Sequence, residues 1–420
     1  MKTLPFTEQE LCAIAAQYPT PFYLYDEAGI RATARSLYDA FSWNEGFKEY
    51  FAVKALPNPI IMKLLAELRC GMDCATETEL LLSERCGITG EEIMFSSNDT
   101  PGAEFAQARA LGAIINLDDA SHIDTLLANG GIPETVCCRY NPGSTFTMTN
   151  CIMGDLRNTK FGMTKPQLFA AMQRLRALGA KRFGIHALLV SCSMEAQYYP
   201  QLAASLFRLA VELKRETGIE LSFIDLSGGI GIPYHPDEAP VEIANIGRAV
   251  QKVYDEILTP AGLNIALFTE LGRFMTGPHG YLVSRVLHKK ETYKNYVGLD
   301  ACAANLMRPA IYGAYHHITI PGRESELAQY RCDVTGGLCE NNDKFAIDRL
   351  LPEPEIGDLV VLHDVGAHGF SMGYNYNGKL RSAEVLLGKD GVVRQIRRAE
   401  SAADYVATFD FLHLFDDMKH

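Results

Sequence analysis

Short apolar runs alternate with longer amphipathic segments from about residue 26 to about residue 275. The apolar runs are rich in β-branched and aromatic residues, which is typical of strands, and they cover residues 49–53, 72–75, 93–96, 113–116, 136–140, 183–190, 221–226 and 265–270. Amphipathic segments of helical period, such as 60–68 and 199–216, separate them. Strands that are joined through helices run parallel, and eight of them can close into a barrel. The pattern therefore predicts a parallel (β/α)8 TIM barrel, with an open doubly wound sheet as the alternative.

The pattern changes after about residue 278, where apolar runs follow one another with turns between them and few long helical segments. These runs cover residues 280–288, 296–300, 316–320, 330–336, 358–364 and 383–387. We therefore expect a barrel domain over residues 26–275, followed by a mostly β C-terminal domain over residues 276–420. Residues 1–25 could pack on either domain, the C-terminal one included.

Composition and charge exclude several classes of function. A chain of 420 residues is long enough for two domains, and its formal net charge of −12 repels the phosphate backbone of nucleic acids. The N-terminus has no apolar segment typical of a signal peptide, and no apolar run is long enough to span a bilayer. The eleven cysteines have irregular spacing without paired C-x-x-C motifs. We expect a cytoplasmic protein with reduced thiols, no membrane or nucleic-acid partner and no metal centre.

Polar side chains gather where the predicted barrel strands end. Active sites of such barrels lie at the carboxyl ends of the strands. Taken singly, a lysine there is usually solvated, a Gly-Gly pair is usually a turn, and an Arg near a Glu is usually an ion pair. Taken together, an amine, a glycine turn that can bind an anion and a carboxylate suit a phosphorylated cofactor that bonds covalently to an amine. The residues concerned are Lys54, Asp73, Ser96, Asn98, Arg139, Asn141, His186, Ser191, the segment 227–231, Glu270 and Arg273.

The chemistry of these groups gives three expectations. Partial burial should lower the pKa of Lys54, so that a neutral amine can attack an aldehyde. The backbone N–H groups of residues 227–229, with the start of the following helix, can hold a phosphate dianion. An ionised Glu270 can keep a pyridine nitrogen protonated, which makes the ring an acceptor for the electrons of a carbanion.

Longer motifs in both halves of the chain identify a family. They are FAVKA at 51–55, KFG at 160–162, SGGIGIPY at 227–234, ELGR at 270–273, MRPAIYGAYHHI at 307–318, GGLCENND at 336–343, LPEPEIGDLVVLHDVGAHGFSM at 351–372 and NYN at 375–377. With these motifs the chain, from about residue 21 to residue 387, resembles diaminopimelate decarboxylases of the fold-type III pyridoxal-phosphate-dependent family.

The resemblance implies pyridoxal 5'-phosphate as cofactor and a set of site residues. Lys54 resembles the lysine that forms the Schiff base, and Cys339 resembles the acid that reprotonates the carbanion. The implied cofactor contacts are Lys54, Asp73, Ser191, Ser227, Gly228, Gly229, Glu270, Gly272, Arg273 and Tyr376. The implied substrate contacts are Arg273, Arg308, Tyr312, Glu340 and Tyr376. In the family, Cys339 and Glu340 come from the partner subunit, which implies a homodimer with active sites at the interface.

Some residues depart from the family pattern. Leu188 occupies the position of the histidine that stacks on the cofactor ring, and His186 matches a histidine that is more often structural. Ser227 replaces a glycine, and its hydroxyl could join the phosphate cradle. Asp73, with Glu79, resembles a support of the cofactor site in ornithine decarboxylases, although a carboxylate at a helix start is an equal alternative.

The resemblance implies decarboxylation of meso-2,6-diaminopimelate to L-lysine and CO2, the last step of lysine biosynthesis. Arg273 and Arg308 could clamp carboxylates of this substrate, and Glu340 could pair with its ammonium group. An ion pair of Arg308 at a domain interface is the ordinary alternative. Carboxynorspermidine, D-ornithine and D-lysine remain alternative substrates of the same scaffold, and a non-catalytic homologue that binds the cofactor remains a third possibility.

Overall fold

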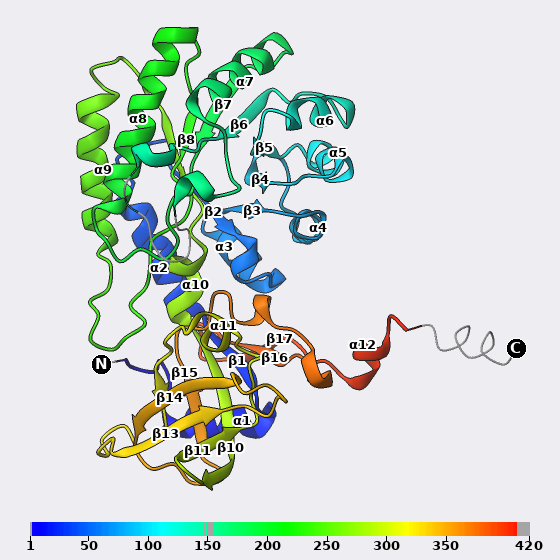
Figure 1. The fold of residues 1–420 in the computed structure, drawn as a ribbon, viewed down its shortest axis with the longest axis vertical. Helices are drawn as coiled ribbons and strands as arrows, with labels where there is room; N and C mark the ends of the chain where they lie inside the picture. Colours follow the sequence, from blue (N-terminus) through cyan, green and yellow to red (C-terminus); the bar gives the residue numbers. More distant parts are fainter. Residues whose placement is uncertain (1, 147, 149–154, 410–420) are drawn as a thin grey trace, which may run out of the picture. The chain divides into compact units, whose positions relative to one another are not determined.

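The computed structural model describes residues 2–146, 148 and 155–409, which divide into two compact units (Figure 1). Within the described residues, one unit comprises residues 28–233 and 238–278. The other comprises residues 2–27, 234–237 and 279–409. The chain therefore passes between the units more than once, and the short segment 234–237 belongs to the second unit although its neighbours in sequence belong to the first.

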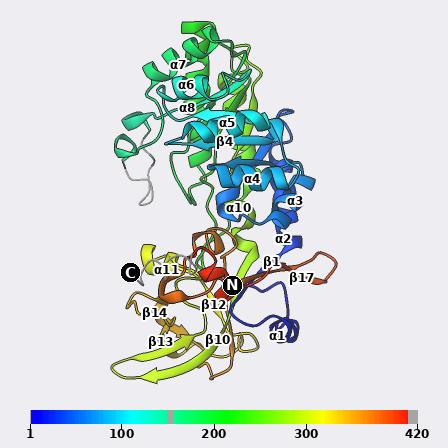
Figure 2. The same ribbon diagram turned by 90° about the vertical axis from the view of Figure 1, so that its right-hand side faces the viewer.

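The first unit is a closed barrel of eight parallel strands, as the sequence predicts. Strand β2 pairs with both β3 and β9, which closes the ring, and the strand residues are mostly buried because helices cover the outside (Figure 2). In order around the barrel, the strands are β2 (Lys48–Ala52), β3 (Gly71–Cys74), β4 (Ile93–Ser97), β5 (Ile114–Leu117), β6 (Thr135–Arg139), β7 (Arg182–His186), β8 (Phe223–Asp225) and β9 (Ala266–Thr269).

Helices α3 and α4 of this unit start at residues whose side chains cap them. Asn58 accepts a hydrogen bond from the N–H of Ile60 at the start of α3, and Thr76 accepts one from the N–H of Glu79 in α4. These two caps mark where the loops after β2 and β3 end, and therefore which of their residues lie at the barrel mouth. The helices are α2 (Glu27–Ala40), α3 (Pro59–Glu67), α4 (Glu77–Arg85), α5 (Gly102–Leu111), α6 (His122–Ala128), α7 (Lys165–Ala177), α8 (Tyr198–Thr217), α9 (Ile243–Ile257) and α10 (Gly272–Thr276).

One predicted strand is shorter than expected. The apolar run 183–190 forms β7 only as far as His186, because its partners β6 and β8 pair no further than Arg139 and Asp225. The apolar residues that follow are largely buried in a loop, where the N–H of Val190 donates to the hydroxyl of Tyr198 at 3.1 Å. Ser191, expected on this strand, therefore lies in the loop between β7 and α8.

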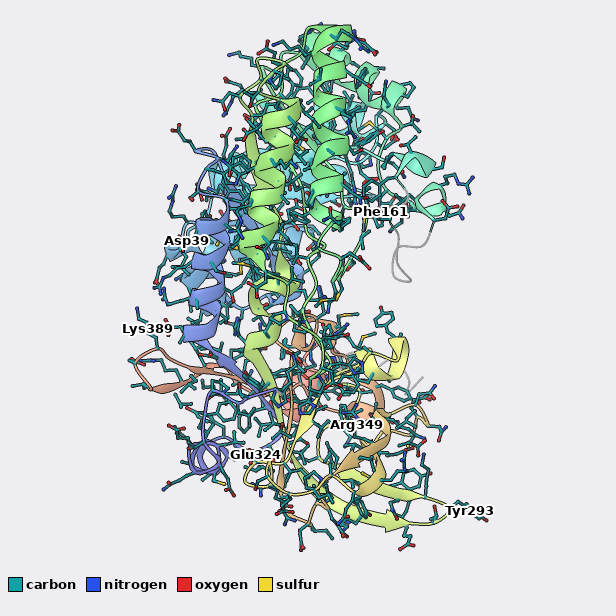
Figure 3. All side chains as sticks on the ribbon, turned by 90° about the vertical axis from the view of Figure 1, so that its left-hand side faces the viewer. Asp39, Phe161, Tyr293, Glu324, Arg349 and Lys389 are labelled. Atoms are coloured by element: carbon teal, nitrogen blue, oxygen red, sulfur yellow. The ribbon has the colours of Figure 1, made fainter. Side chains whose placement is uncertain are left out.

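The second unit is built on a mostly antiparallel sheet with the order β14-β13-β11-β10-β1-β16-β17, in which β15 also pairs with β10, and β12 pairs with β15. Strand β1 (Phe22–Asp26) lies between β10 (Gly280–Glu291) and β16 (Ala383–Leu387), so the N-terminal residues belong to this sheet. Tyr293 marks the tip of the β10–β11 hairpin (Figure 3). The remaining elements are α1 (Glu8–Gln17), β11 (Asn295–Leu299), α11 (Arg308–Tyr312), β12 (Ile318–Thr319), β13 (Tyr330–Thr335), β14 (Lys344–Leu351), β15 (Leu359–Leu362), β17 (Val393–Arg397) and α12 (Ala402–Val406).

The core of this unit holds the sheet and the N-terminal helix together. Phe22 and Leu24 of β1 pack with Leu11 and Ile14 of α1 and with Val283 of β10, all of them buried. The sequence pattern did not predict β1, β14 or β17. Among the described residues, no helix is both long enough and apolar enough to cross a membrane.

Candidate active site

Lys54 lies at the mouth of the barrel beside a buried carboxylate. It is the middle residue of the short helix η1 (Val53–Ala55), which follows β2 directly. The register that pairs Ala52 with Asp73 brings the Lys54 Nζ within 2.7 Å of Asp73 Oδ2. The Asp73 side chain is fully buried, whereas 47% of the Lys54 side chain is exposed. The amine of Lys54, which solvent and ligands can reach, is therefore held by the buried carboxylate of Asp73.

The charge of Lys54 differs from the sequence-based expectation. Burial lowers the pKa of its amine, but the carboxylates of Asp73 and Glu270 outweigh burial and raise the pKa above the ordinary lysine value. The expected fall of the pKa was therefore wrong, because the expectation left out two buried carboxylates. Lys54 is an ammonium group at neutral pH.

Glu270 follows β9 and is held by donors from three other strands or loops. Its Oε2 accepts a hydrogen bond from Ser227 Oγ at 2.8 Å and lies 3.1 Å from His186 Nε2. Its Oε1 lies 3.4 Å from Ser96 Oγ. Burial raises the pKa of Glu270, but His186, Lys54 and Ser227 outweigh burial and lower the pKa below the ordinary value. Glu270 is therefore an ionised carboxylate inside the barrel.

His186 is one of these donors. Burial lowers the pKa of its imidazole more than the nearby Glu270 raises it, so the ring is neutral at pH 7. Because Nε2 faces a carboxylate, the proton of the neutral ring lies on Nε2. His186 therefore supports Glu270 from within the barrel.

The glycine turn after β8 differs from the expected cradle in two ways. The N–H of Ser227 donates to Asp225 Oδ1 at 2.7 Å, and its hydroxyl donates to Glu270, so neither is directed to a phosphate. Helix α9 begins only at Ile243, so no helix start follows the turn directly. Among the described residues, the N–H groups of Gly228 and Gly229 have no hydrogen-bond partner. These two groups are the anion-binding donors that the turn retains.

The loop after β7 pairs with this turn. The N–H of Ser193 donates to the carbonyl of Gly229, and the N–H of Gly231 donates to the carbonyl of Ser193, both at 2.7 Å. Gly229 has a φ of +112°, and a Cβ there would lie 2.7 Å from the carbonyl oxygen of Val190. The pairing places Ser191 beside the glycine turn although it is not on a strand. Leu188, in the same loop, is half-buried.

Other residues expected at the barrel mouth have local structural partners. Arg139 forms an ion pair with Asp118 at 3.3 Å, and its guanidinium lies 4.3 Å from the ring centroid of Phe161. The amide of Asn141 donates to the carbonyls of residues 156 and 161. The carboxylate of Glu79 accepts a hydrogen bond from the N–H of Ala75 at 2.7 Å, which is the role of a carboxylate at a helix start.

Gly272 and Arg273 begin α10, at the end of the barrel. A Cβ on Gly272 would lie 2.7 Å from the Cβ of Ala55, so the absence of a side chain lets α10 pack against the segment that carries Lys54. Arg273 is half-buried at the start of this helix. Gly272 therefore positions the lysine segment, whatever contact it makes with a ligand.

Two buried polar residues of the site were missed by sequence reasoning. Asn116 on β5 donates to Ser96 Oγ at 3.1 Å and so extends the hydrogen-bond chain that ends on Glu270. Asp225 on β8 is fully buried and holds the N–H of Ser227, and burial raises the pKa of its carboxyl group. The signal was present in both cases, because each is a polar residue inside an otherwise apolar strand.

The candidate residues of the second unit form two groups. Arg308, the first residue of α11, is buried with 7% exposure. Its Nη1 donates to the hydroxyl of Tyr234 at 2.7 Å and lies 3.3 Å from His316 Nε2, while its guanidinium lies 4.9 Å from the Tyr234 ring centroid. Tyr312, at the end of the same helix, is exposed.

The second group joins two turns. The N–H of Cys339 donates to Asn377 Oδ1 at 2.7 Å, which places the turn of Cys339 and Glu340 beside Tyr376. Cys339, Glu340 and Tyr376 are all exposed in the single chain. The structure thus brings Lys54, Asp73, Ser227 and Glu270 together in the barrel unit. It brings Cys339 and Tyr376 together in the other unit.

Comparison with protein families decides the identity. The family model described as "Pyridoxal-dependent decarboxylase, pyridoxal binding domain" matches residues 27–277, which include the whole barrel. The chain belongs to this family. It is a pyridoxal-phosphate-dependent amino-acid decarboxylase, a carboxy-lyase, and its cofactor is pyridoxal 5'-phosphate.

Relatives of this decarboxylase extend over both units. Protein TabA of Pseudomonas amygdali pv. tabaci is 41% identical over 92% of this chain and 90% of its own length. A diaminopimelate decarboxylase of Methanothermobacter thermautotrophicus is 34% identical over 93% of this chain and 92% of its own. The crystal structure of the Methanocaldococcus jannaschii diaminopimelate decarboxylase in co-complex with L-lysine superposes with a TM-score of 0.86 at 29% identity, covering 96% of this chain and 95% of that one.

The barrel residues of the decarboxylase fit pyridoxal phosphate. The cofactor needs an accessible amine, a negative group for its ring nitrogen and donors for its phosphate. Lys54, the ionised Glu270 and the N–H groups of Gly228 and Gly229 are groups of these three kinds. In addition, the buried Oδ1 atoms of Asp73 and Asn116 have no hydrogen-bond partner among the described residues, as expected at a site that holds a polar ligand.

Proposed function

We propose that this decarboxylase converts meso-2,6-diaminopimelate to L-lysine and CO2, the last step of lysine biosynthesis. Several relatives named diaminopimelate decarboxylase match over more than nine-tenths of the chain, and the structure of one such enzyme was solved with L-lysine. Protein TabA matches at higher identity, and its name states no substrate. The choice of substrate therefore depends on the chain's own residues.

The barrel residues have distinct roles in this proposal. When bound, pyridoxal phosphate supplies an aldehyde carbon for an amine and a protonated ring that accepts an electron pair. Lys54 is the amine that holds the cofactor, and Asp73 orients it. Glu270 keeps the proton on the ring nitrogen, and Gly228, Gly229 and Ser191 hold the phosphate. Arg273 and Tyr376 complete the cofactor contacts and also reach the substrate.

Arg308 is the observation that carries the choice of substrate. Its Nη1 donates to the hydroxyl of Tyr234, and it can also donate to His316 Nε2 when that nitrogen carries no proton. His316 Nδ1 lies 2.8 Å from the carbonyl oxygen of His363, which fixes the ring. A guanidinium held in this way suits bidentate binding of a carboxylate.

The distal end of the substrate distinguishes the candidates. Meso-diaminopimelate carries a second carboxylate there, whereas D-lysine and D-ornithine end in an amine alone. In the proposal, Arg308 and Arg273 bind carboxylates, Glu340 pairs with the distal ammonium and Tyr312 lines the pocket. A substrate without a distal carboxylate gains nothing from Arg308.

We also propose that a second copy of the chain completes the site. Cys339 Sγ donates a proton to the substrate carbon after CO2 leaves, and such a donor must be shielded from bulk water. In the single chain Cys339 and Glu340 are exposed. A partner subunit that receives them in its own site would supply the shielding.

The purified protein with pyridoxal phosphate should release CO2 and L-lysine from meso-diaminopimelate. The Arg308→Gln variant should lose roughly 30-fold or more of kcat/KM for this substrate, because a buried charge partner is removed, with no equal loss for D-lysine. The matched control is Arg331→Gln, which changes an exposed arginine of the same unit. A native preference for D-lysine, D-ornithine or carboxynorspermidine would overturn the proposed substrate. If the protein releases no CO2 from any of these substrates, the alternative of a non-catalytic homologue that binds the cofactor would be supported.

A further inference from the structure

Ser227 has an unusual backbone for a residue with a side chain. Its φ is +55°, in the left-handed region that favours glycine, and only 1% of the residue is exposed. Its N–H donates to Asp225 Oδ1 at 2.7 Å, and its carbonyl oxygen accepts a hydrogen bond from the hydroxyl of Tyr199 at 2.5 Å. The surroundings therefore hold Ser227 in a costly conformation from both sides, which points to a use for its side chain.

The hydroxyl of Ser227 points to the carboxylate of Glu270. Ser227 Oγ donates to Glu270 Oε2 at 2.8 Å, the same oxygen that faces His186 Nε2 at 3.1 Å. Glycine would adopt the same φ without strain, and what it lacks is this donor. The serine is therefore maintained against its backbone cost by a hydrogen bond to the ionised carboxylate of Glu270.

We infer that Ser227 is a positioning residue that, with His186, orients the Glu270 carboxylate and keeps its negative charge directed at the cofactor ring. This inference rests on the proposed role of Glu270. It gives the serine a different task from the phosphate cradle expected from its place in the glycine turn.

The consequence concerns where the ring proton lies. A donor to a carboxylate makes that carboxylate less basic, so the proton that Glu270 shares with the ring nitrogen stays on the ring. Without the hydroxyl, Glu270 becomes more basic and less fixed in orientation, and the ring accepts electrons less well. Hydrogen bonds to charged groups are strong enough for an effect of roughly tenfold on the step that needs the charged ring.

Two variants separate the hydroxyl from the backbone strain. Ser227→Ala removes the hydroxyl and keeps the strained Cβ, whereas Ser227→Gly removes both. The cofactor-free Gly variant should therefore unfold at a higher temperature than the Ala variant. Ser222→Ala is the matched control. Ser222 is an exposed serine that precedes β8, whereas Ser227 is a buried serine that follows it.

Both variants should bind pyridoxal phosphate roughly tenfold more weakly and lose roughly tenfold in kcat with an unchanged KM. With cofactor labelled at the ring nitrogen, the 15N resonance should move toward the unprotonated value in both. A Gly variant with the native affinity and the native 15N resonance would overturn the inference, because the hydroxyl would then have no role. A shift in the Ala variant alone would also overturn it, because strain would be the cause.

The Glu270→Gln variant distinguishes this inference from the proposed function. If Glu270→Gln leaves the 15N resonance native, the role proposed for Glu270 fails and the inference fails with it. If Glu270→Gln moves the resonance while both Ser227 variants keep it, the inference about Ser227 fails alone. If all three move it in the same direction, the inference is supported.

Discussion

At the scale of single residues, the pair of Lys54 and Asp73 sets the charge of the reactive amine. Asp73→Asn removes the nearest negative charge and keeps the size of the side chain, so the pKa of Lys54 should fall by about 1–3 units. The pKa falls because the Asp73 carboxylate stabilises the ammonium form of Lys54, and this form loses its proton more easily once the carboxylate is removed. The pH dependence of acylation of Lys54 in the cofactor-free protein, measured by mass spectrometry, checks the shift.

Asp99→Asn is the control for this change. Asp99 is exposed and lies 3.9 Å from Lys160, so its loss should leave the reactivity of Lys54 unaltered. An Asp73→Asn protein whose Lys54 reacts with the native pH profile would show that Asp73 does not control the amine.

Residues of the site differed in how far the sequence could predict them. The positions of Lys54 and Glu270 at the strand ends could be predicted, because each follows an apolar run that the local pattern contains. The direction of the Lys54 pKa was missed, because it depends on Asp73, which only the register of neighbouring strands brings within reach. The direction of the Ser227 hydroxyl was missed because it follows from a positive φ that composition does not reveal.

At the scale of elements, the period of the apolar runs predicted all eight barrel strands and the change to a β-rich second part. The apolar runs did not indicate the residue at which each strand stops pairing with its neighbours. The run 183–190 is apolar throughout, yet β7 ends at His186 because its neighbours end there. Strand β1 was missed because it is a short run near the N-terminus. Its partners β10 and β16 come hundreds of residues later in the chain.

Packing between neighbouring strands gives a prediction at this scale. A Cβ on Gly184 of β7 would lie 2.1 Å from the ring of Phe223 on β8, which is closer than any relaxed contact. Gly184→Ala should therefore destabilise the barrel by about 1–3 kcal/mol through overpacking. Urea unfolding followed by the fluorescence of Trp43, the single tryptophan and part of the barrel unit, measures the change.

The matching substitution with room for a methyl group is Gly298→Ala in β11, where the nearest atom to a new Cβ is the His288 carbonyl oxygen at 3.6 Å. Circular dichroism of this variant should report unfolding close to that of the native protein. Equal midpoints for Gly184→Ala and the native protein would mean that β7 and β8 can separate at little cost.

At the scale of the whole molecule, one continuous segment serves both units. Residues 227–229 form the turn beside Glu270 in the barrel, and a few residues later Tyr234 belongs to the second unit, where it holds Arg308. The sequence presented this segment as a single motif, SGGIGIPY, and gave no sign that its two ends have different structural roles. The motif therefore contains both the glycine turn of the barrel and a residue that contacts Arg308 in the second unit.

The proposed sharing of sites between two copies makes the last prediction. Lys54→Ala removes the amine of a site, and Cys339→Ala removes a proton donor that the proposal assigns to the partner's site. Each variant alone should be nearly inactive. After the two are unfolded, mixed in equal amounts and refolded, half of the dimers should be mixed, and each mixed dimer should contain one native site. The mixture should therefore recover about a quarter of the native activity, as random pairing in a symmetric dimer requires.

Measurement of lysine formation together with the mass in solution tests this scheme. If Cys339 acted within its own chain, every site of a mixed dimer would carry one of the two substitutions, and mixing would restore nothing. A gain on mixing that disappears on dilution, as the dimer dissociates, would tie the recovered activity to the assembly. Recovery of activity on mixing would account for the exposed position of Cys339 in the single chain, because a proton donor needs the shielding that a partner subunit would supply.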